Sequence, residues 1–220
     1  MSAVLSELDA AAIEARIRAL EARTGVEVVT AVVARSDRYH GLRWRAFALG
    51  AALAALAVVV ADQARPDWIH AHAVLSTVTA ILGAGLAFAL LATAWPAFER
   101  RFLQRERAEA EARSHAKALF LSRELFATPE RTAVLLFASQ FERVVVVFGD
   151  RGYDGRVTPH DWRRIVDAMT PSLEGGDVRM AFLAGLDALE ALLVAKGFAS
   201  GGSTRDLLPD KPLTPAADDE

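Results

Sequence analysis

The residues best suited to chemistry in this sequence lie in a glycine-rich stretch at positions 149–155, GDRGYDG. Two carboxylates, Asp150 and Asp154, flank Arg151 directly after an apolar run. Carboxylate oxygens are preferred ligands of Ca²⁺ and Mg²⁺, and an arginine can pair with phosphate oxygens. Loops beyond the strand ends of an open α/β sheet often hold the ligand site. The sequence therefore predicts a metal site at Asp150 and Asp154, with Arg151 as a phosphate contact.

The same stretch also fits an ordinary tight turn. Asp side chains accept hydrogen bonds from nearby backbone amides, and Gly adopts positive φ without strain. The spacing differs from the EF-hand calcium loop. Both interpretations of the 149–155 loop stay open at this point.

Other acidic residues have structural interpretations. Asp161 follows Thr158 and Pro159, which is typical of a helix start with an acidic residue in the first turn. Asp177 stands directly before an apolar run and is expected to cap a helix. Glu142 falls between two strand patterns, where an exposed charge is ordinary.

Established catalytic signatures are missing from the sequence. It contains no phosphate-binding G-x-x-x-x-G-K-[ST], no G-x-S-x-G and no H-E-x-x-H. The count of zero cysteines excludes a disulfide scaffold, a Cys-ligated zinc site and a thiol nucleophile. No catalytic residue is assigned. Chemistry on a phosphate group held by Arg151 would have to rest on a carboxylate-held ion, Ca²⁺ or Mg²⁺.

The composition points to a membrane component. Of 220 residues, 53% are hydrophobic and 24% are charged, and the net charge of −3 argues against nucleic-acid binding. Stretches 46–61 and 71–98 contain no Lys, Arg, Asp or Glu. Since about 20 apolar residues cross a bilayer as a helix, we expect a transmembrane hairpin over 42–98, with spans 42–61 and 71–95 and a short external loop 62–70.

Aromatic and basic residues agree with this hairpin. Trp44, Trp68 and Trp95 fall at predicted boundaries of the spans. Gly83 and Gly85 could permit close helix contact. The flanks outside the hairpin share a basic character: Arg35, Arg38, Arg43, Arg45, Arg100, Arg101, Arg105 and Arg107. The connecting loop has only one arginine, which predicts that both termini are cytoplasmic.

The remaining sequence predicts a split α/β domain with a sheet of at least three strands. Expected helices cover 7–24, 99–126, 158–170 and 178–196, and expected strands cover 26–34, 132–139 and 143–148, the last two as an antiparallel hairpin. One helix and one strand cannot form a core, so the partners of 26–34 must follow the membrane hairpin. Residues 199–220 are expected to form a disordered acidic tail.

This order of elements resembles the TPM domain family, and within it the bacterial subset with a transmembrane hairpin inserted in the domain. That subset implies a protein of the bacterial inner membrane. The resemblance covers about 7–35 and 105–197 and rests on TGVEVVTAVV and on TPERTAVLLFASQFERVVVVFGDRGYDGRV. It implies a sandwich of a central β-sheet flanked by helices, here interrupted by the hairpin. Plant and cyanobacterial relatives act around photosystem II repair, and an acid phosphatase activity has been attributed to one branch. Many bacterial members have no settled activity.

Two functions follow as hypotheses. The first is a membrane-anchored interaction or maintenance module on the cytoplasmic side, with the lipid bilayer and an unidentified protein as partners and self-association left open. The basic flanks suit anionic lipid heads, or they set topology alone. The alternative is a weak metal-dependent acid phosphatase that uses the carboxylates of the 149–155 loop.

Overall fold

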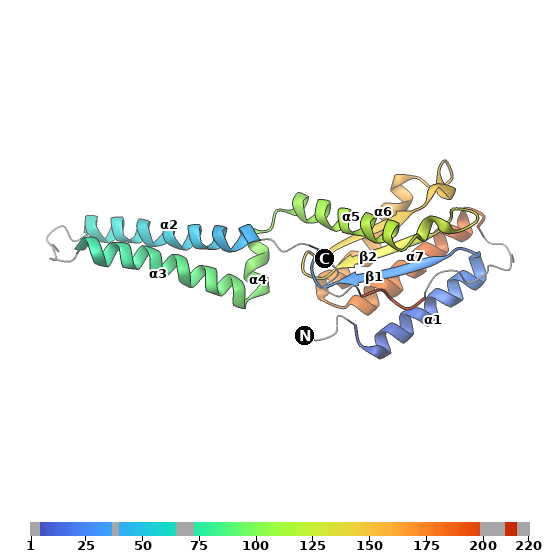
Figure 1. Ribbon diagram of the computed structural model, residues 1–220, viewed down its shortest axis with the longest axis horizontal. Helices are drawn as coiled ribbons and strands as arrows, with labels where there is room; N and C mark the ends of the chain where they lie inside the picture. Colours follow the sequence, from blue (N-terminus) through green and yellow to red (C-terminus); the bar gives the residue numbers. More distant parts are fainter. Residues whose placement is uncertain (1–4, 37–39, 65–72, 199–209, 215–220) are drawn as a thin grey trace. The chain divides into compact units, whose positions relative to one another are not determined.

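The computed structural model describes residues 5–36, 40–64, 73–198 and 210–214 (Figure 1). The chain divides into two compact units. The sheet unit combines Met1–Asp37 with Glu106–Glu220, and the hairpin unit is Arg38–Arg105. The sheet unit contains α1 (Glu7–Thr24), β1 (Val28–Val33), α5 (Arg105–Ser122), β2 (Val134–Ser139), β3 (Val144–Gly149), α6 (Pro159–Gly175) and α7 (Val178–Ala195), with short 3₁₀ turns η2 (Leu125–Ala127) and η3 (Arg151–Tyr153).

The sheet has the order β1-β2-β3 within the described residues. Strand β1 pairs parallel to β2, with Val28 opposite Val134, and β2 pairs antiparallel to β3, with Val134 opposite Gly149. The predicted hairpin of the last two strands is confirmed. Parallel strands need a long crossover connection, and the hairpin unit lies within it.

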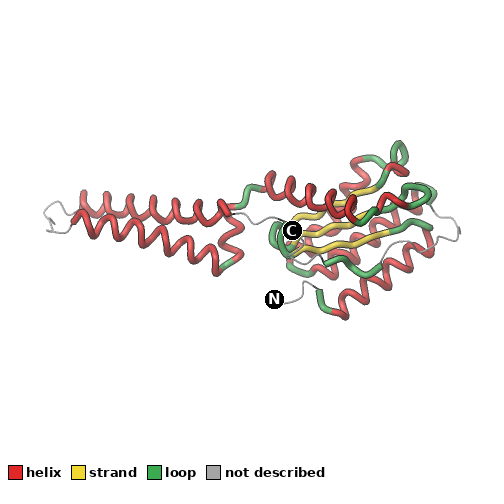
Figure 2. Tube along the Cα trace, in the orientation of Figure 1, coloured by secondary structure: helices red, strands yellow, loops and turns green. Residues whose placement is uncertain are grey.

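Helices cover both faces of this sheet, as the tube in Figure 2 illustrates. Alternate strand residues point to opposite faces, so each strand contributes to two cores. On one face, Val28 and Val32 pack with apolar residues of α1, α6 and α7. On the other face, Val29 and Ala31 pack with residues of α5. The predicted α/β sandwich is therefore present.

Local capping signals set several helix ends where the sequence predicts them. Helix α1 starts at the N-cap Ser6 and ends at Gly25, whose φ is 69°. Thr158 and Asp161 form a reciprocal capping box at α6, and Asp177 caps α7. The Thr158 backbone amide and Lys196 hold the pKa of Asp161 well below its usual range. Asp161 and Asp177 thus have the capping roles expected of them.

Two helix predictions need correction. Helix α6 does not stop near Thr170 but continues through Pro171 to Gly175. The additional turn buries Leu173 in the core beside Met169, which offsets the cost of the proline. The long helix expected over 99–126 is interrupted. A short helix, α4 (Pro96–Glu99), and a 3₁₀ turn, η1 (Arg100–Phe102), precede an extended Leu103, and α5 begins only at Arg105.

The hairpin unit consists mainly of two antiparallel helices, α2 (His40–Ala64) and α3 (Ala73–Ala94). Both are long and apolar enough to cross a membrane. Helix α2 extends beyond its predicted end into the expected external loop, while 65–72, with Trp68, lie outside the described residues.

Glycines set the contact between α2 and α3. A Cβ on Gly85 would lie 2.7 Å from the Phe47 ring, and one on Gly50 would lie 2.7 Å from the Ala84 carbonyl oxygen. A Cβ on Gly83 would meet nothing within 4 Å. Gly85 therefore permits close contact as expected, Gly50 was missed, and Gly83 does not take part.

A short segment near the end of the sequence joins the sheet. Leu213 forms a parallel bridge with Ala31 of β1. The expectation of a disordered tail over 199–220 therefore does not hold at 210–214, because backbone pairing and an apolar side chain fix that segment. Residues 199–209 and 215–220 lie outside the described residues.

Candidate functional site

The predicted site loop, 149–155, follows the end of β3. Because β3 runs antiparallel to β2, the loop lies at the end of the sheet where β1 and β2 begin. Ligands of open α/β sheets bind at the other end, beyond the carboxyl ends of the parallel strands. The structure therefore offers two separate regions for a site, one at each end of the strands.

Asp150 is buried at the beginning of the loop and has an arginine partner. Its carboxylate accepts hydrogen bonds from Arg131 Nε at 2.6 Å and Nη2 at 3.0 Å, and from the Arg151 backbone amide at 2.8 Å. Burial raises the pKa of Asp150, but the hydrogen bonds from Arg131 and Arg151 outweigh burial, so the net pKa is lowered. The three donors around the Asp150 carboxylate thus favour its ionised form.

The backbone around this ion pair leaves little room. A Cβ on Gly152 would lie 2.7 Å from the carbonyl oxygens of Arg131 and Glu130, so only glycine fits there. The buried Tyr153 hydroxyl donates to the Thr132 carbonyl at 2.5 Å. These contacts fasten the loop to the turn before β2.

The other two residues predicted for the site, Arg151 and Asp154, are exposed. The charge of Arg151 helps to lower the pKa of Asp150, and its backbone amide donates to the Asp150 carboxylate. Within the described residues, no group of three His, Cys, Asp or Glu side chains could surround a metal ion. The metal site at Asp150 and Asp154 and the phosphate contact at Arg151 stay predictions.

Glu142 is buried at the other end of the sheet, beyond the carboxyl ends of β1 and β2. It accepts from the Ser36 backbone amide at 2.9 Å and from the Ser139 hydroxyl. The expectation of an exposed charge was wrong, because the β2–β3 turn folds back against the end of β1, where the Phe141 amide donates to the Ala34 carbonyl. Glu142 therefore ties the two parallel strands together.

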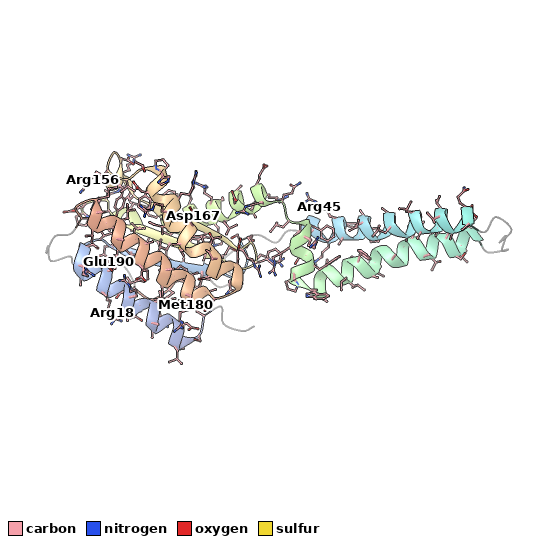
Figure 3. All side chains as sticks on the ribbon, turned by 180° about the vertical axis from the view of Figure 1, so that it is seen from behind. Arg18, Arg45, Arg156, Asp167, Met180 and Glu190 are labelled. Carbon is pink, nitrogen blue, oxygen red and sulfur yellow. The ribbon has the colours of Figure 1, made fainter. Side chains whose placement is uncertain are left out.

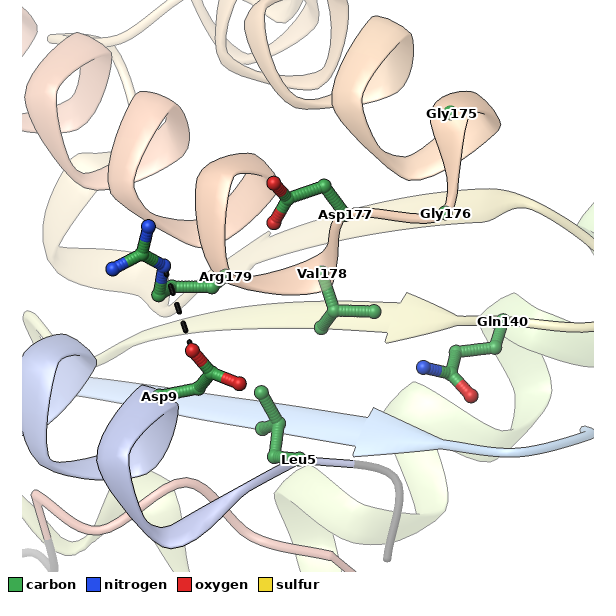
Figure 4. A pocket seen from close by; sticks show the side chains of 8 residues that line it. All are labelled: Leu5, Asp9, Gln140, Gly175, Gly176, Asp177, Val178 and Arg179. Carbon is green, nitrogen blue, oxygen red and sulfur yellow. Dashed lines mark ion pairs between the residues drawn. The ribbon is translucent and has the colours of Figure 1, made fainter. Parts of the chain in front are cut away.

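A cleft of about 510 Å³ opens at this same end of the sheet, and Figure 4 shows the residues that line it. Its lining residues are Leu5, Asp9, Gln140, Gly175, Gly176, Asp177, Val178 and Arg179. Gln140 follows β2, the glycines end α6, and the remaining residues come from the beginnings of α1 and α7. The end of β2, the end of α6 and the starts of α1 and α7 thus converge here.

Charged groups in the cleft are already engaged. Arg179 Nε lies 3.5 Å from Asp9 Oδ1, the ion pair dashed in Figure 4. Asp177 accepts from the Met180 amide at 2.9 Å. An arginine and an amide suit the binding of a small polar group, but the cleft contains no Ser, Thr, His or Cys among its lining residues to act as a nucleophile or neutral-pH base. The sequence could not reveal this cleft because its walls come from four separate elements.

A three-layer α/β unit with a parallel β1–β2 pair, an antiparallel β3 and an inserted helical hairpin defines the class of this protein. Residues 102–192 match the family model of the TPM domain, so the chain contains a TPM domain. The matched part includes β2, β3, α6 and most of α7. The family resemblance of the sequence is confirmed.

A solved structure has a similar fold. It is the NMR structure of BA42 protein from the psychrophilic bacterium Bizionia argentinensis, with a TM-score of 0.58 and 13% sequence identity over 98% of each chain. At this identity the likeness concerns the fold alone. No curated protein matches the sequence.

Proposed function

We propose that this protein is a membrane-tethered interaction module, in which the hairpin unit anchors a TPM domain at the cytoplasmic face of a bacterial inner membrane. The observation that carries the proposal is the exposure of apolar side chains along both long helices. Leu53 and Leu56 on α2 and Leu82, Leu86 and Leu90 on α3 are between 49% and 61% exposed. A water-soluble helical pair would bury such residues, whereas a bilayer accommodates them.

Residues at one end of the hairpin unit suit a membrane interface. Arg43 and Arg45 begin α2, and Arg101 follows α3, so their charges gather at the same end. Arg45 donates to the Phe102 carbonyl at 3.0 Å, which joins the two sides of that end. Trp44 and Trp95 are 72% and 60% exposed there. Basic and indole side chains at one end favour an arrangement in which this end faces the cytoplasm.

The sheet topology supports a hairpin with two crossings. Residues on either side of the hairpin unit meet in one sheet, since Val28–Val33 pairs with Val134–Ser139. Both halves must therefore occupy the same side of any membrane, which requires an even number of spans. Helices α2 and α3 supply two.

The anchoring half of this proposal is tested by membrane extraction. The wild-type chain should stay in the membrane after alkaline carbonate treatment. A full chain with Leu53→Arg and Leu86→Arg should be released, since each charge costs roughly 3 kcal/mol at the bilayer centre. Release of both proteins, or retention of both, would contradict the anchor. Leu8→Arg, an exposed position on α1, is the matched control and should be retained.

The interaction half is tested by photocrosslinking from the sheet unit in native membranes. A photoreactive residue at Gln140, which lines the cleft, or at the exposed position Arg143, should capture one recurring protein. The same residue at Leu53, within the anchor, should capture lipid instead. Recovery of only lipids and chaperones from every position would contradict the module.

The alternative, a weak metal-dependent acid phosphatase, is supported by the family resemblance and by the exposed Asp154 carboxylate in the same loop as the exposed Arg151. Asp150 would have to exchange Arg131 for an ion, which makes Asp154 the more informative position. Turnover of a phosphate monoester with Mg²⁺ or Ca²⁺ that falls at least tenfold in Asp154→Asn, with the fold unchanged, would favour this alternative over the module. Absence of turnover with either ion would exclude it.

A further inference from the structure

Strand β1 lies at the edge of the sheet, and its outer side is partly covered by the 210–214 segment, drawn in dark red in Figure 1. The Leu213 amide donates to the Thr30 carbonyl at 2.8 Å, and the Val32 amide donates to the Leu213 carbonyl at 2.9 Å. The Val28 amide donates to the Glu21 carboxylate at 2.7 Å, which closes the beginning of this edge. An extended segment can thus add to β1 in parallel orientation over its second half.

Side chains of the 210–214 segment contact residues on both faces of the sheet. Asp210 Oδ2 accepts from Arg18 Nε of α1 at 3.0 Å. Leu213 packs against the apolar cluster on the α5 face. Asp210 and Leu213 thus contact opposite faces, so an acid and an apolar residue at this spacing straddle the lateral edge of the sheet. Figure 3, seen from behind, shows Arg18 on α1, which covers the face of the sheet opposite to α5.

The resident segment fits incompletely. Among the described residues, the buried Asp210 Oδ1 of the segment has no hydrogen-bond partner. A buried polar group without a partner is destabilising. The bridge also involves only one of the six residues of β1. Both features describe an occupant that another strand can displace.

We propose that the β1 edge docks an extended segment of a partner protein, parallel to β1, with an acidic residue three positions before a branched apolar residue. The 210–214 segment is the chain's own copy of this pattern and competes for the same edge. Strand addition draws affinity from main-chain hydrogen bonds and specificity from alternate side chains, both of which Leu213 and Asp210 exemplify. This inference rests on the interaction role proposed above and gives it a surface.

The test uses the full chain in detergent micelles and a fluorescent peptide with the sequence of residues 207–216, LLPDKPLTPA. A tethered competitor has an effective concentration of roughly millimolar, so wild type should bind the peptide weakly. Leu213→Asp weakens the resident segment and should tighten peptide binding at least tenfold in fluorescence anisotropy. Asp210→Arg, which repels Arg18 without changing apolar packing, should give the same direction of change.

Specificity is read from two controls. Adding Arg18→Glu to the Leu213→Asp chain should abolish the gain, and a peptide with Asp in place of its leucine should not bind. Equal binding to wild type and to both weakened variants, or no binding to any of them, would overturn the proposal. A wild-type dimer in light scattering that Leu213→Asp dissolves would also overturn it, because the occupant would then be a second copy. Capture of a membrane protein in the crosslinking test despite absent peptide binding would leave the module standing without this surface.

Discussion

Replacing Asp150 with Asn should destabilise the sheet unit at neutral pH, because its carboxylate accepts three hydrogen bonds in a buried position. Asn keeps the shape but loses the charge and one acceptor oxygen. Deleting hydrogen bonds to a buried charge costs about 1.5–3 kcal/mol. We expect a loss of about 2 kcal/mol in the free energy of unfolding. For a unit of this size, the expected drop in Tm is about 4–8 °C.

The assay is thermal unfolding of the full chain in micelles, followed by Trp162 fluorescence. Trp162 packs edge-on against Tyr153, with ring centroids 5.2 Å apart, so it reports on the loop directly. The other three tryptophans are replaced by Phe in every variant: Trp44, Trp68 and Trp95. Asp154→Asn, an exposed carboxylate of the same loop, is the matched control and should change the free energy by less than about 0.5 kcal/mol.

The effect of Asp150→Asn should depend on pH in a defined direction. The pKa of Asp150 is lower in the folded chain than in the unfolded chain, so ionised Asp150 stabilises the fold above the unfolded pKa of about 4. That stabilisation is lost as the pH falls through the lowered folded pKa. The difference between wild type and Asp150→Asn should therefore be full at pH 6–7 and shrink below about pH 4. Equal stability at pH 7, or a difference that grows in acid, would refute the role assigned to this ion pair.

Three further substitutions test close contacts. Gly85→Leu would collide with the Phe47 ring and should lower the free energy of unfolding of the hairpin unit in micelles by about 1–3 kcal/mol. The control Gly83→Leu should be near neutral, and equal effects of the two substitutions would contradict the α2–α3 contact. Gly152→Ala would press on two carbonyl oxygens and should lower the urea midpoint of unfolding clearly. The control Gly175→Ala, whose Cβ would meet nothing within 4 Å, should leave the midpoint unchanged. A larger drop in Gly175→Ala than in Gly152→Ala would contradict the loop geometry. Glu142→Gln loses one of two acceptor oxygens and should lower the free energy of unfolding by about 1–2 kcal/mol in urea. No change in that free energy would contradict the buried position of Glu142.

Local signals were enough to predict several elements. Ser6, Thr158 and Asp177 cap their helices because capping depends on residues within one turn. The apolar stretches predicted α2 and α3 because length and composition alone decide whether a helix can span a bilayer.

Contacts between distant segments were beyond such signals. The parallel pairing of β1 with β2 joins residues about a hundred positions apart. It also decides that the 149–155 loop lies near the beginning of β1 and not near its end. Glu142 was misjudged for the same reason, since Ser36 belongs to the other side of the hairpin unit. The pairing of Leu213 with Ala31 rests on one residue in a polar segment, which leaves no periodic pattern to detect.

The central claim is that α2 and α3 cross the membrane and leave both halves of the sheet unit in the cytoplasm. The cysteine-free sequence permits a direct measurement by labelling single cysteines with a membrane-impermeant maleimide in intact cells. Gln63→Cys, at the exposed far end of α2, should be labelled from outside. Leu8→Cys and Asp154→Cys, one on each side of the hairpin in sequence, should react only after the membrane is opened. Labelling of either sheet-unit position in intact cells, or protection of Gln63→Cys there, would contradict the account.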